Sequence, residues 1–207
     1  MIQMALTVAG GLVELKLLDK RILKATQGTF VSYRSGKDLP KGFKDIEEIT
    51  DTIKANFDSV SALIERRNTI KSAIVVSNAV TKVEIAGETM TVAEAIERKN
   101  SIAYEKQLLN AYKFQLGNAI RTVDHLNEEV KKRADNMVEA FLGGDKSKAS
   151  EAEKLRNDYL ESHSAAIIDT IDIKKQIEKL EERIDKFEAD VDLVLSTSNA
   201  ITELNIA

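Results

Sequence analysis

Two long stretches of regularly spaced apolar residues, separated by one glycine turn, constrain this chain most. Apolar side chains recur at steps of mostly three and four residues from Leu109 to Phe141, and again from Ile173 to Val194. That spacing lines one face of a helix and is the period of a coiled-coil seam. Gly143 and Gly144 end the first stretch, as glycine commonly does just past a helix C-terminus. The pattern predicts a long antiparallel helical hairpin.

Composition favours long, uninterrupted helices in this hairpin. The 207 residues include one proline and nine glycines, and 31% of them are charged while 5% are aromatic. These proportions fit amphipathic helices better than a β-sandwich or barrel. We therefore expect the hairpin to occupy residues 92–195, with its second helix unbroken from about Ser147 to Leu195.

The remaining segments complete a mainly α fold. Residues 7–26 and 45–76 have the apolar spacing of two further helices. Residues 27–43 lose that spacing and carry glycine and proline, so they predict a surface loop. Residues 81–92 alternate apolar and charged side chains around a glycine, which predicts a small β-hairpin. Residues 196–207 form a tail, and the loose alternation of their apolar residues is compatible with a short strand. Together the segments predict one elongated helical domain over residues 1–207.

Charge and composition exclude several classes of function. Thirty basic and 34 acidic residues give a formal net charge of −4, which disfavours nucleic acid as the main partner. The absence of cysteine excludes disulfides, thiolate metal sites and thiol nucleophiles. The apolar start, residues 1–13, lacks a basic segment and is shorter than the ~20 residues of a spanning helix. We expect neither a signal peptide nor a membrane anchor, and a location in the cytoplasm of the producing cell.

Candidate catalytic chemistry is sparse. His125 and His163 lack the neighbours of a known metal motif, so both are interpreted as exposed or interfacial. The glycine pairs are not phosphate loops, and no serine lies in a nucleophile-elbow motif. Basic clusters at residues 66–71 and 131–133 have acids nearby and are interpreted as solvated faces. The sequence predicts no enzyme, cofactor or metal site.

The apolar spine of the long hairpin is the best candidate for an interaction surface. Such a seam can pack within one chain or between chains, and the spacing does not distinguish the two. The helices are long relative to the two shorter ones, so an exposed apolar strip is expected, and such strips mark partners. The candidate seam consists of Tyr112, Leu116, Ile120, Ile173, Ile177, Leu180, Ile184 and Phe187.

Two parts of the chain, Leu63–Ile102 and the tail, match a known family residue by residue. The matching positions are Arg67, Asn68, Asn78, Thr81, Gly87, Thr91, Glu94, Ala95, Arg98, Asn199, Thr202, Glu203 and Leu204. On these residues, and in the order of segments over most of the chain, the sequence resembles the septicolysin-like family of small helical bacterial proteins. Ala200 and Ile201 stand where that family has a tryptophan near the tail motif, and the helical hairpin here is longer.

The resemblance implies an architecture and brings no catalytic residue. It suggests that Asn68, Asn78, Thr81 and Asn199 cap helix ends and tie the tail to the β-hairpin, as short polar side chains do. Independently of the resemblance, the spacing of Thr91 and Glu94 predicts a capping box at the start of a helix.

These observations favour a non-enzymatic structural or interaction protein that assembles with itself or with other protein subunits. Its most concrete form is a bacteriophage virion protein or another phage-encoded component. Three alternatives stay open: a membrane-active, pore-forming protein, an inhibitor that binds a host protein, and an enzyme or small-ligand binder built between helices.

Overall fold

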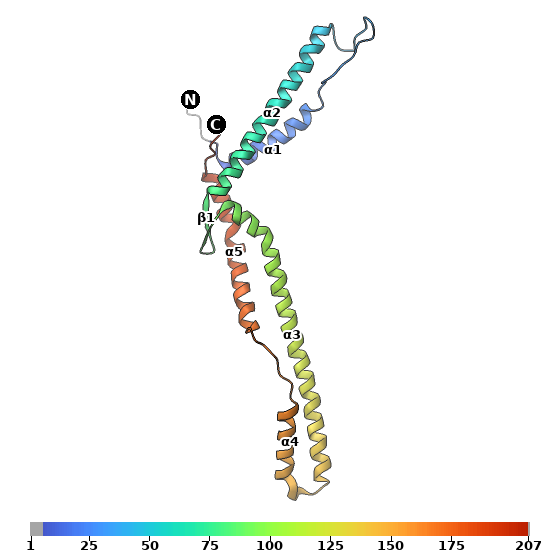
Figure 1. The fold of residues 1–207 in the computed structure, drawn as a ribbon, viewed down its shortest axis with the longest axis vertical. Helices are drawn as coiled ribbons and strands as arrows, with labels where there is room; N and C mark the ends of the chain where they lie inside the picture. The colour runs from blue at the N-terminus through green and yellow to red at the C-terminus, as the bar shows by residue number, and fades with distance from the viewer. Residues whose placement is uncertain (1–5, 207) are drawn as a thin grey trace. The chain divides into compact units, whose positions relative to one another are not determined.

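The computed structural model describes residues 6–206 and is mainly α, as predicted (Figure 1). The two-stranded β-hairpin is antiparallel, and its register pairs Lys82 with Thr91 and Ile85 with Glu88. The elements in chain order are α1 (Val8–Ala25), α2 (Ile46–Val80), β1 (Lys82–Ile85), β2 (Glu88–Thr91), α3 (Val92–Leu142), a 3-10 turn (Lys146–Lys148), α4 (Ala149–His163) and α5 (Ile173–Ile201).

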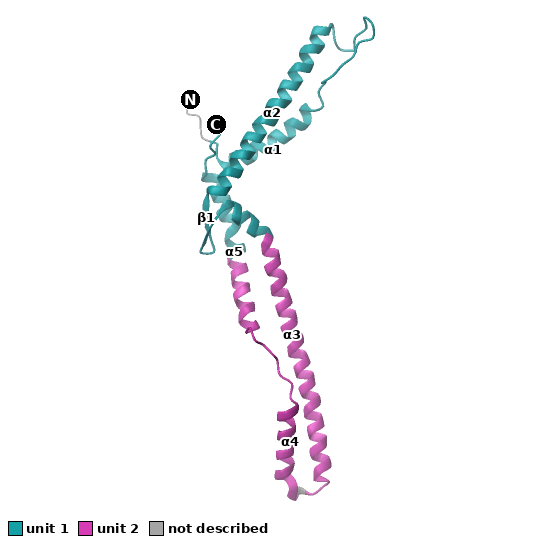
Figure 2. Ribbon diagram, viewed as in Figure 1, with its two compact units in different colours: residues 1–100, 187–207 teal, residues 101–186 magenta. Residues whose placement is uncertain are grey.

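The chain divides into two compact units (Figure 2). Unit 1 comprises residues 1–100 and 187–207, and unit 2 comprises residues 101–186. Helices α3 and α5 each contribute residues to both units. The single domain expected over residues 1–207 stays a prediction, because compactness alone does not decide whether the units fold independently.

The core of unit 1 lies where α1 packs against α2. The N-cap residue Thr7 starts α1 by accepting a hydrogen bond from the Gly10 amide through its hydroxyl, at 3.2 Å. The apolar face of α1 then meets the second half of α2. The buried residues of this core are Val8, Leu15, Leu18, Ile70, Ile74 and Leu204.

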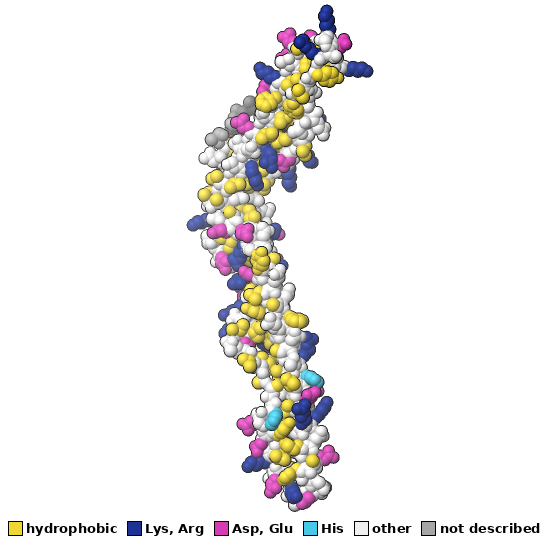
Figure 3. Space-filling view, turned by 45° about the vertical axis from the view of Figure 1, so that its right-hand side comes forward, with side chains coloured by type: hydrophobic (Ala, Val, Ile, Leu, Met, Phe, Trp, Pro, Cys, Tyr) yellow, Lys and Arg dark blue, Asp and Glu magenta, His cyan; other side chains and the backbone are white. Residues whose placement is uncertain are grey.

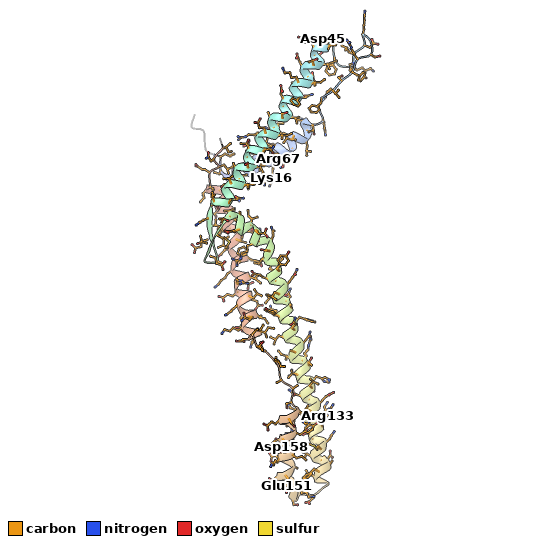
Figure 4. All side chains as sticks on the ribbon, in the orientation of Figure 1. Lys16, Asp45, Arg67, Arg133, Glu151 and Asp158 are labelled. Atoms are coloured by element: carbon orange, nitrogen blue, oxygen red, sulfur yellow. The ribbon has the colours of Figure 1, made fainter. Side chains whose placement is uncertain are left out.

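An N-cap starts α2, and two ion pairs link α2 to α1. Asp45 starts α2 by accepting a hydrogen bond from the Glu48 amide at 2.8 Å (Figure 4). Farther along the helix, Arg66 pairs with Glu14 at 2.9 Å. Arg67 pairs with Asp19 at 2.5 Å. Exposed ion pairs of this kind contribute little to stability, about 1 kcal/mol or less each. They therefore affect the orientation of α2 beside α1 more than the free energy of unfolding.

The two ends of the described chain pair with each other. The Val8 amide donates to the Thr202 carbonyl at 2.9 Å, and the Leu204 amide donates to the Leu6 carbonyl at 2.8 Å. The sequence placed a tail from residue 196, whereas α5 continues to Ile201. The expected strand is therefore limited to an isolated bridge between Thr7 and Glu203, because the last turns of α5 remain helical.

The β-hairpin leads directly into α3. Its turn residues Ala86 and Gly87 have φ of 53° and 79°, the left-handed values of a tight hairpin turn. The capping box predicted at the helix start is present: the Thr91 amide donates to Glu94 at 2.6 Å, and the Glu94 amide donates to the Thr91 hydroxyl at 3.1 Å. α3 then runs from Val92 to Leu142, the bounds that the apolar spacing predicted.

In unit 2 the chain returns alongside α3 (Figure 2). Asp135 pairs with Arg156 on α4 at 2.8 Å, and Glu105 pairs with Arg183 on α5 at 3.1 Å. The prediction of one unbroken helix over residues 147–195 is wrong, because residues 164–172 between α4 and α5 are irregular. We call residues 164–172 the linker.

Two side chains account for the break. Asn127 of α3 binds the backbone of Ala165, accepting from its amide at 2.7 Å and donating to its carbonyl at 3.0 Å. Asp169 accepts from the Ile173 amide at 2.9 Å, which satisfies a backbone donor at the start of α5. Asp172, just before α5, has φ of 54°, a left-handed value uncommon for a non-glycine residue. The linker is thus held in a non-helical path from both ends.

Candidate interaction surface

Four of the five α5 residues in the predicted seam are covered within the chain. Ile177, Leu180, Ile184 and Phe187 expose 9, 7, 3 and 0% of their surface. In unit 1 the guanidinium carbon of Arg98 lies 4.6 Å from the centre of the Phe187 ring, which closes that end of the spine. These four residues therefore serve as internal core and are not accessible to a partner.

The α3 half of the seam is more open. Tyr112 and Leu116 are half-buried, Ile173 at the start of α5 is half-buried, and Ile120 is 42% exposed. A groove of about 220 Å³ runs between Leu108 and Tyr112 of α3 and the first turns of α5. The seam residues of α3 therefore line an open surface of unit 2.

A second and larger groove of unit 2 lies beside the linker, lined by apolar residues together with Gln115, Asp169 and Thr170. It encloses about 370 Å³ between the Leu116–Ala119 turn of α3 and residues 167–173. Ile167, Ile168 and Ile171 of the linker are 41, 93 and 51% exposed, although isoleucine is usually buried. We call this groove and the three linker isoleucines the linker surface.

The linker isoleucines were missed because their segment was assigned to a continuous helix. The apolar spine that supported this assignment begins only at Ile173, and residues 165–168 place four apolar side chains in succession instead. Four consecutive apolar residues do not follow the spacing of one helix face. This run is the sequence signal that the apolar seam does not extend to residues before Ile173.

The polar residues expected to cap helix ends are only partly so placed. Thr81 is the C-cap of α2, where its amide donates to the Ser77 carbonyl at 2.9 Å. Asn78 and Asn199 lie in the last turns of α2 and α5. The assignment of Asn68 to a helix end is wrong, because α2 continues twelve residues beyond it, to Val80.

Some of these residues meet the tail at one site in unit 1. Asn68 and Thr81 line an open groove of about 680 Å³ together with Thr202 and Glu203. The groove lies along one side of α2, and its lining mixes hydroxyl and amide side chains with Val76. Asn68 and Thr81 thus share a groove with the tail, and a tie between the tail and the β-hairpin stays a prediction.

Among the described residues, three carboxyl groups have a pKa that hydrogen bonds lower. Hydrogen bonds from Thr91, from Ser147 and from Lys186 lower the pKa of Glu94, Asp145 and Glu182, respectively. A general acid at neutral pH needs the opposite shift.

The two histidines lie in unit 2. His125 lies 3.6 Å from Glu129, and the ring of His163 stacks on that of Tyr159 at 4.1 Å. Within residues 6–206, no group of three potential ligands could hold a metal ion.

Three of the six cations in the two basic clusters pair with acids. Arg66 and Arg67 pair with carboxylates of α1, as described above. On α3, Arg133 pairs at 3.4 Å with Glu129, one turn earlier (Figure 4). These contacts agree with the interpretation of both clusters as solvated faces.

No family model, curated protein or solved structure matches this chain. None of the helices in the described range is both long and apolar enough to cross a bilayer. The linker surface, with its exposed isoleucines, is the feature of unit 2 that bears most directly on function.

Proposed function

We propose that this chain is a non-enzymatic structural protein that assembles with copies of itself through the linker surface. The observation that carries the proposal is the exposure of Ile167, Ile168 and Ile171 beside a groove of about 370 Å³. Full burial of an exposed isoleucine side chain contributes about 1.5–3 kcal/mol. Ile168, which is 93% exposed, therefore has the most to gain from a partner, and Ile167 and Ile171 have less.

A second copy of the chain suits this surface because the exposed side chain of Ile168 and the groove lie next to each other. Ile168 is 93% exposed, and the groove that it borders is lined by Leu116 and Ala119. A two-fold axis would place Ile168 of each copy over the groove of the other, since an isologous interface uses the same patch twice. Tyr112 and the neighbouring groove extend the same contact.

The most concrete form of this function is a bacteriophage virion protein or another phage-encoded component, made in the cytoplasm of the producing cell. Repeated self-contacts are what such a particle requires, and no catalytic chemistry is needed. The resemblance to septicolysin-like proteins supports the layout and adds no activity. The alternatives are a pore-forming protein, for which dye leakage from vesicles is the test, and an inhibitor that binds a host protein.

Solution mass tests self-assembly directly. Light scattering after size-exclusion chromatography should give a defined multiple of 23.0 kDa for the wild type across a range of concentrations. Ile168→Ser should weaken association about tenfold or more, because it removes an apolar side chain buried at the contact.

Leu193→Ser is the matched control, since Leu193 is also exposed, at 71%, and lies in unit 1. This variant should keep the wild-type mass. A wild-type protein that stays at 23.0 kDa at every concentration would exclude the proposal, as would equal effects of the two variants.

A further inference from the structure

Positive charge is concentrated in one part of unit 1. Residues 16–44 carry eight basic and two acidic side chains, in a chain with 30 basic and 34 acidic residues. The rest of the chain therefore carries 22 basic and 32 acidic residues. The basic residues are Lys16, Lys20, Arg21 and Lys24 of α1 and Arg34, Lys37, Lys41 and Lys44 of the following loop. We call these eight residues the basic face.

The acidic residues of α1 are turned toward α2. Glu14 pairs with Arg66 and Asp19 pairs with Arg67, so both carboxylates are occupied by cations of the neighbouring helix. All eight residues of the basic face are exposed. Within residues 6–206, none of the eight side-chain cations lies within 4 Å of a carboxylate oxygen. The outward side of α1 thus presents cations without counter-charges.

Aliphatic side chains and one tyrosine are interleaved with these cations. On α1, Val13 and Leu23 are each 69% exposed and Leu17 is 47% exposed. In the loop, Val31 is 82% exposed and Tyr33 is 74% exposed. Figure 3 shows hydrophobic side chains next to Lys and Arg side chains at the loop end of unit 1. An apolar side chain at such a position gains free energy only if a partner removes it from water.

Apart from Asp38 within the loop, the acids that follow the basic face in sequence lie at the start of α2. Asp45 and Glu48 stand in the first turn of α2, at the end of the loop. Asp45 caps the Glu48 amide at 2.8 Å, and Glu48 accepts from the Lys44 amide at 2.8 Å. Both carboxylates therefore offset the positive end of the α2 dipole.

We infer that the basic face is a docking surface for an anionic lipid bilayer, bound peripherally. Lys and Arg side chains near an anionic membrane are attracted by its negative surface potential. The interleaved Val, Leu and Tyr side chains can enter the boundary between headgroups and acyl chains. A nucleic acid would use the same cations, but its interfaces are more polar than those between proteins and gain little from exposed aliphatic side chains. This surface is separate from the linker surface, which lies in unit 2.

Vesicle co-sedimentation of the full chain tests the inference. Vesicles of phosphatidylcholine and phosphatidylglycerol at three to one should bind the wild type at low salt, whereas pure phosphatidylcholine vesicles should not. Lys20→Gln with Lys24→Gln should lower the partition coefficient about tenfold or more. Lys131→Gln with Lys132→Gln makes the same charge change on exposed residues of α3 and should stay within about twofold of wild type. Circular dichroism confirms that each variant folds.

Two further comparisons separate lipid from other polyanions. Leu23→Ser should weaken vesicle binding, whereas Leu193→Ser, at a similarly exposed site on α5, should not. Absence of binding to the anionic vesicles, or equal losses in both lysine pairs, would overturn the inference. Binding to a DNA duplex that is tighter than vesicle binding and unchanged by Leu23→Ser would assign the surface to nucleic acid instead.

Discussion

Asn127 on α3 holds Ala165 of the linker by two hydrogen bonds between its side-chain amide and the Ala165 backbone. The Ala165 amide donates to Oδ1 at 2.7 Å, and Nδ2 donates to the Ala165 carbonyl at 3.0 Å. The side-chain amide thus offers the same donor and acceptor as a neighbouring strand would. Since both partners are half-buried, these bonds replace water at the point where α4 has ended and the linker begins.

Asn127→Ala should therefore release the linker while α3 stays helical. The loss of two half-buried hydrogen bonds should cost about 1–2 kcal/mol, partly offset by the higher helix propensity of alanine. Hydrogen exchange read by mass spectrometry should show faster exchange in peptides covering residues 164–172. Asn110→Ala, an exposed asparagine on the same helix, should leave those peptides unchanged. Unchanged exchange in Asn127→Ala would mean that the linker is held by other contacts.

Local sequence signals predicted most of the fold and missed the linker, for a physical reason. The bounds of α3 and its capping box follow from residues within one turn of each other, such as Thr91 and Glu94. The break between α4 and α5 depends on Asn127, which lies 38 residues from Ala165 in sequence. Likewise, helical spacing identified Phe187 as part of an apolar seam, but it could not show that this seam is covered inside the chain.

Glu94 makes stability depend on pH in a predictable direction. Hydrogen bonds from the amide and the hydroxyl of Thr91 lower the pKa of Glu94 from its ordinary value of 4.5. A carboxylate with a depressed folded-state pKa stabilises the fold fully above the unfolded pKa, and this contribution is lost as the pH falls through the folded value. Stability should therefore decline below about pH 4.5, partly through this cap.

Glu94→Gln should reduce that decline, because glutamine can still accept the cap hydrogen bonds but has no charge to lose. The measurement is the free energy of unfolding from urea titrations at pH 7 and at pH 3. Glu97→Gln, which makes the same charge change one turn later in α3, should keep the wild-type difference between the two pH values. If Glu94→Gln shows the full wild-type decline, the capping box does not hold Glu94 ionised in solution.

Gly11 and Gly117 should respond in opposite directions to the same substitution. A methyl group at Gly11 would lie 2.8 Å from Leu204 Cδ1 and 3.3 Å from Ile70 Cγ2, both in the core of unit 1. A methyl group at Gly117, within α3, would meet no heavy atom within 4 Å. Gly117→Ala should stabilise by about 0.5–1 kcal/mol through helix propensity. Gly11→Ala should instead destabilise by about 1–3 kcal/mol, because overpacking outweighs that gain.

A double-mutant cycle identifies the residue that Gly11→Ala displaces. Leu204→Ala alone should destabilise by about 2–5 kcal/mol, as other deletions of a buried leucine do. In the Gly11→Ala background the same change should cost less, because it also removes the clash, so the two effects should be coupled by about 0.5–3 kcal/mol. Free energies of unfolding from denaturant titration give all four corners. Additive effects would contradict the seating of Leu204 against α1, and with it the closure of the chain's C-terminal segment onto its first helix.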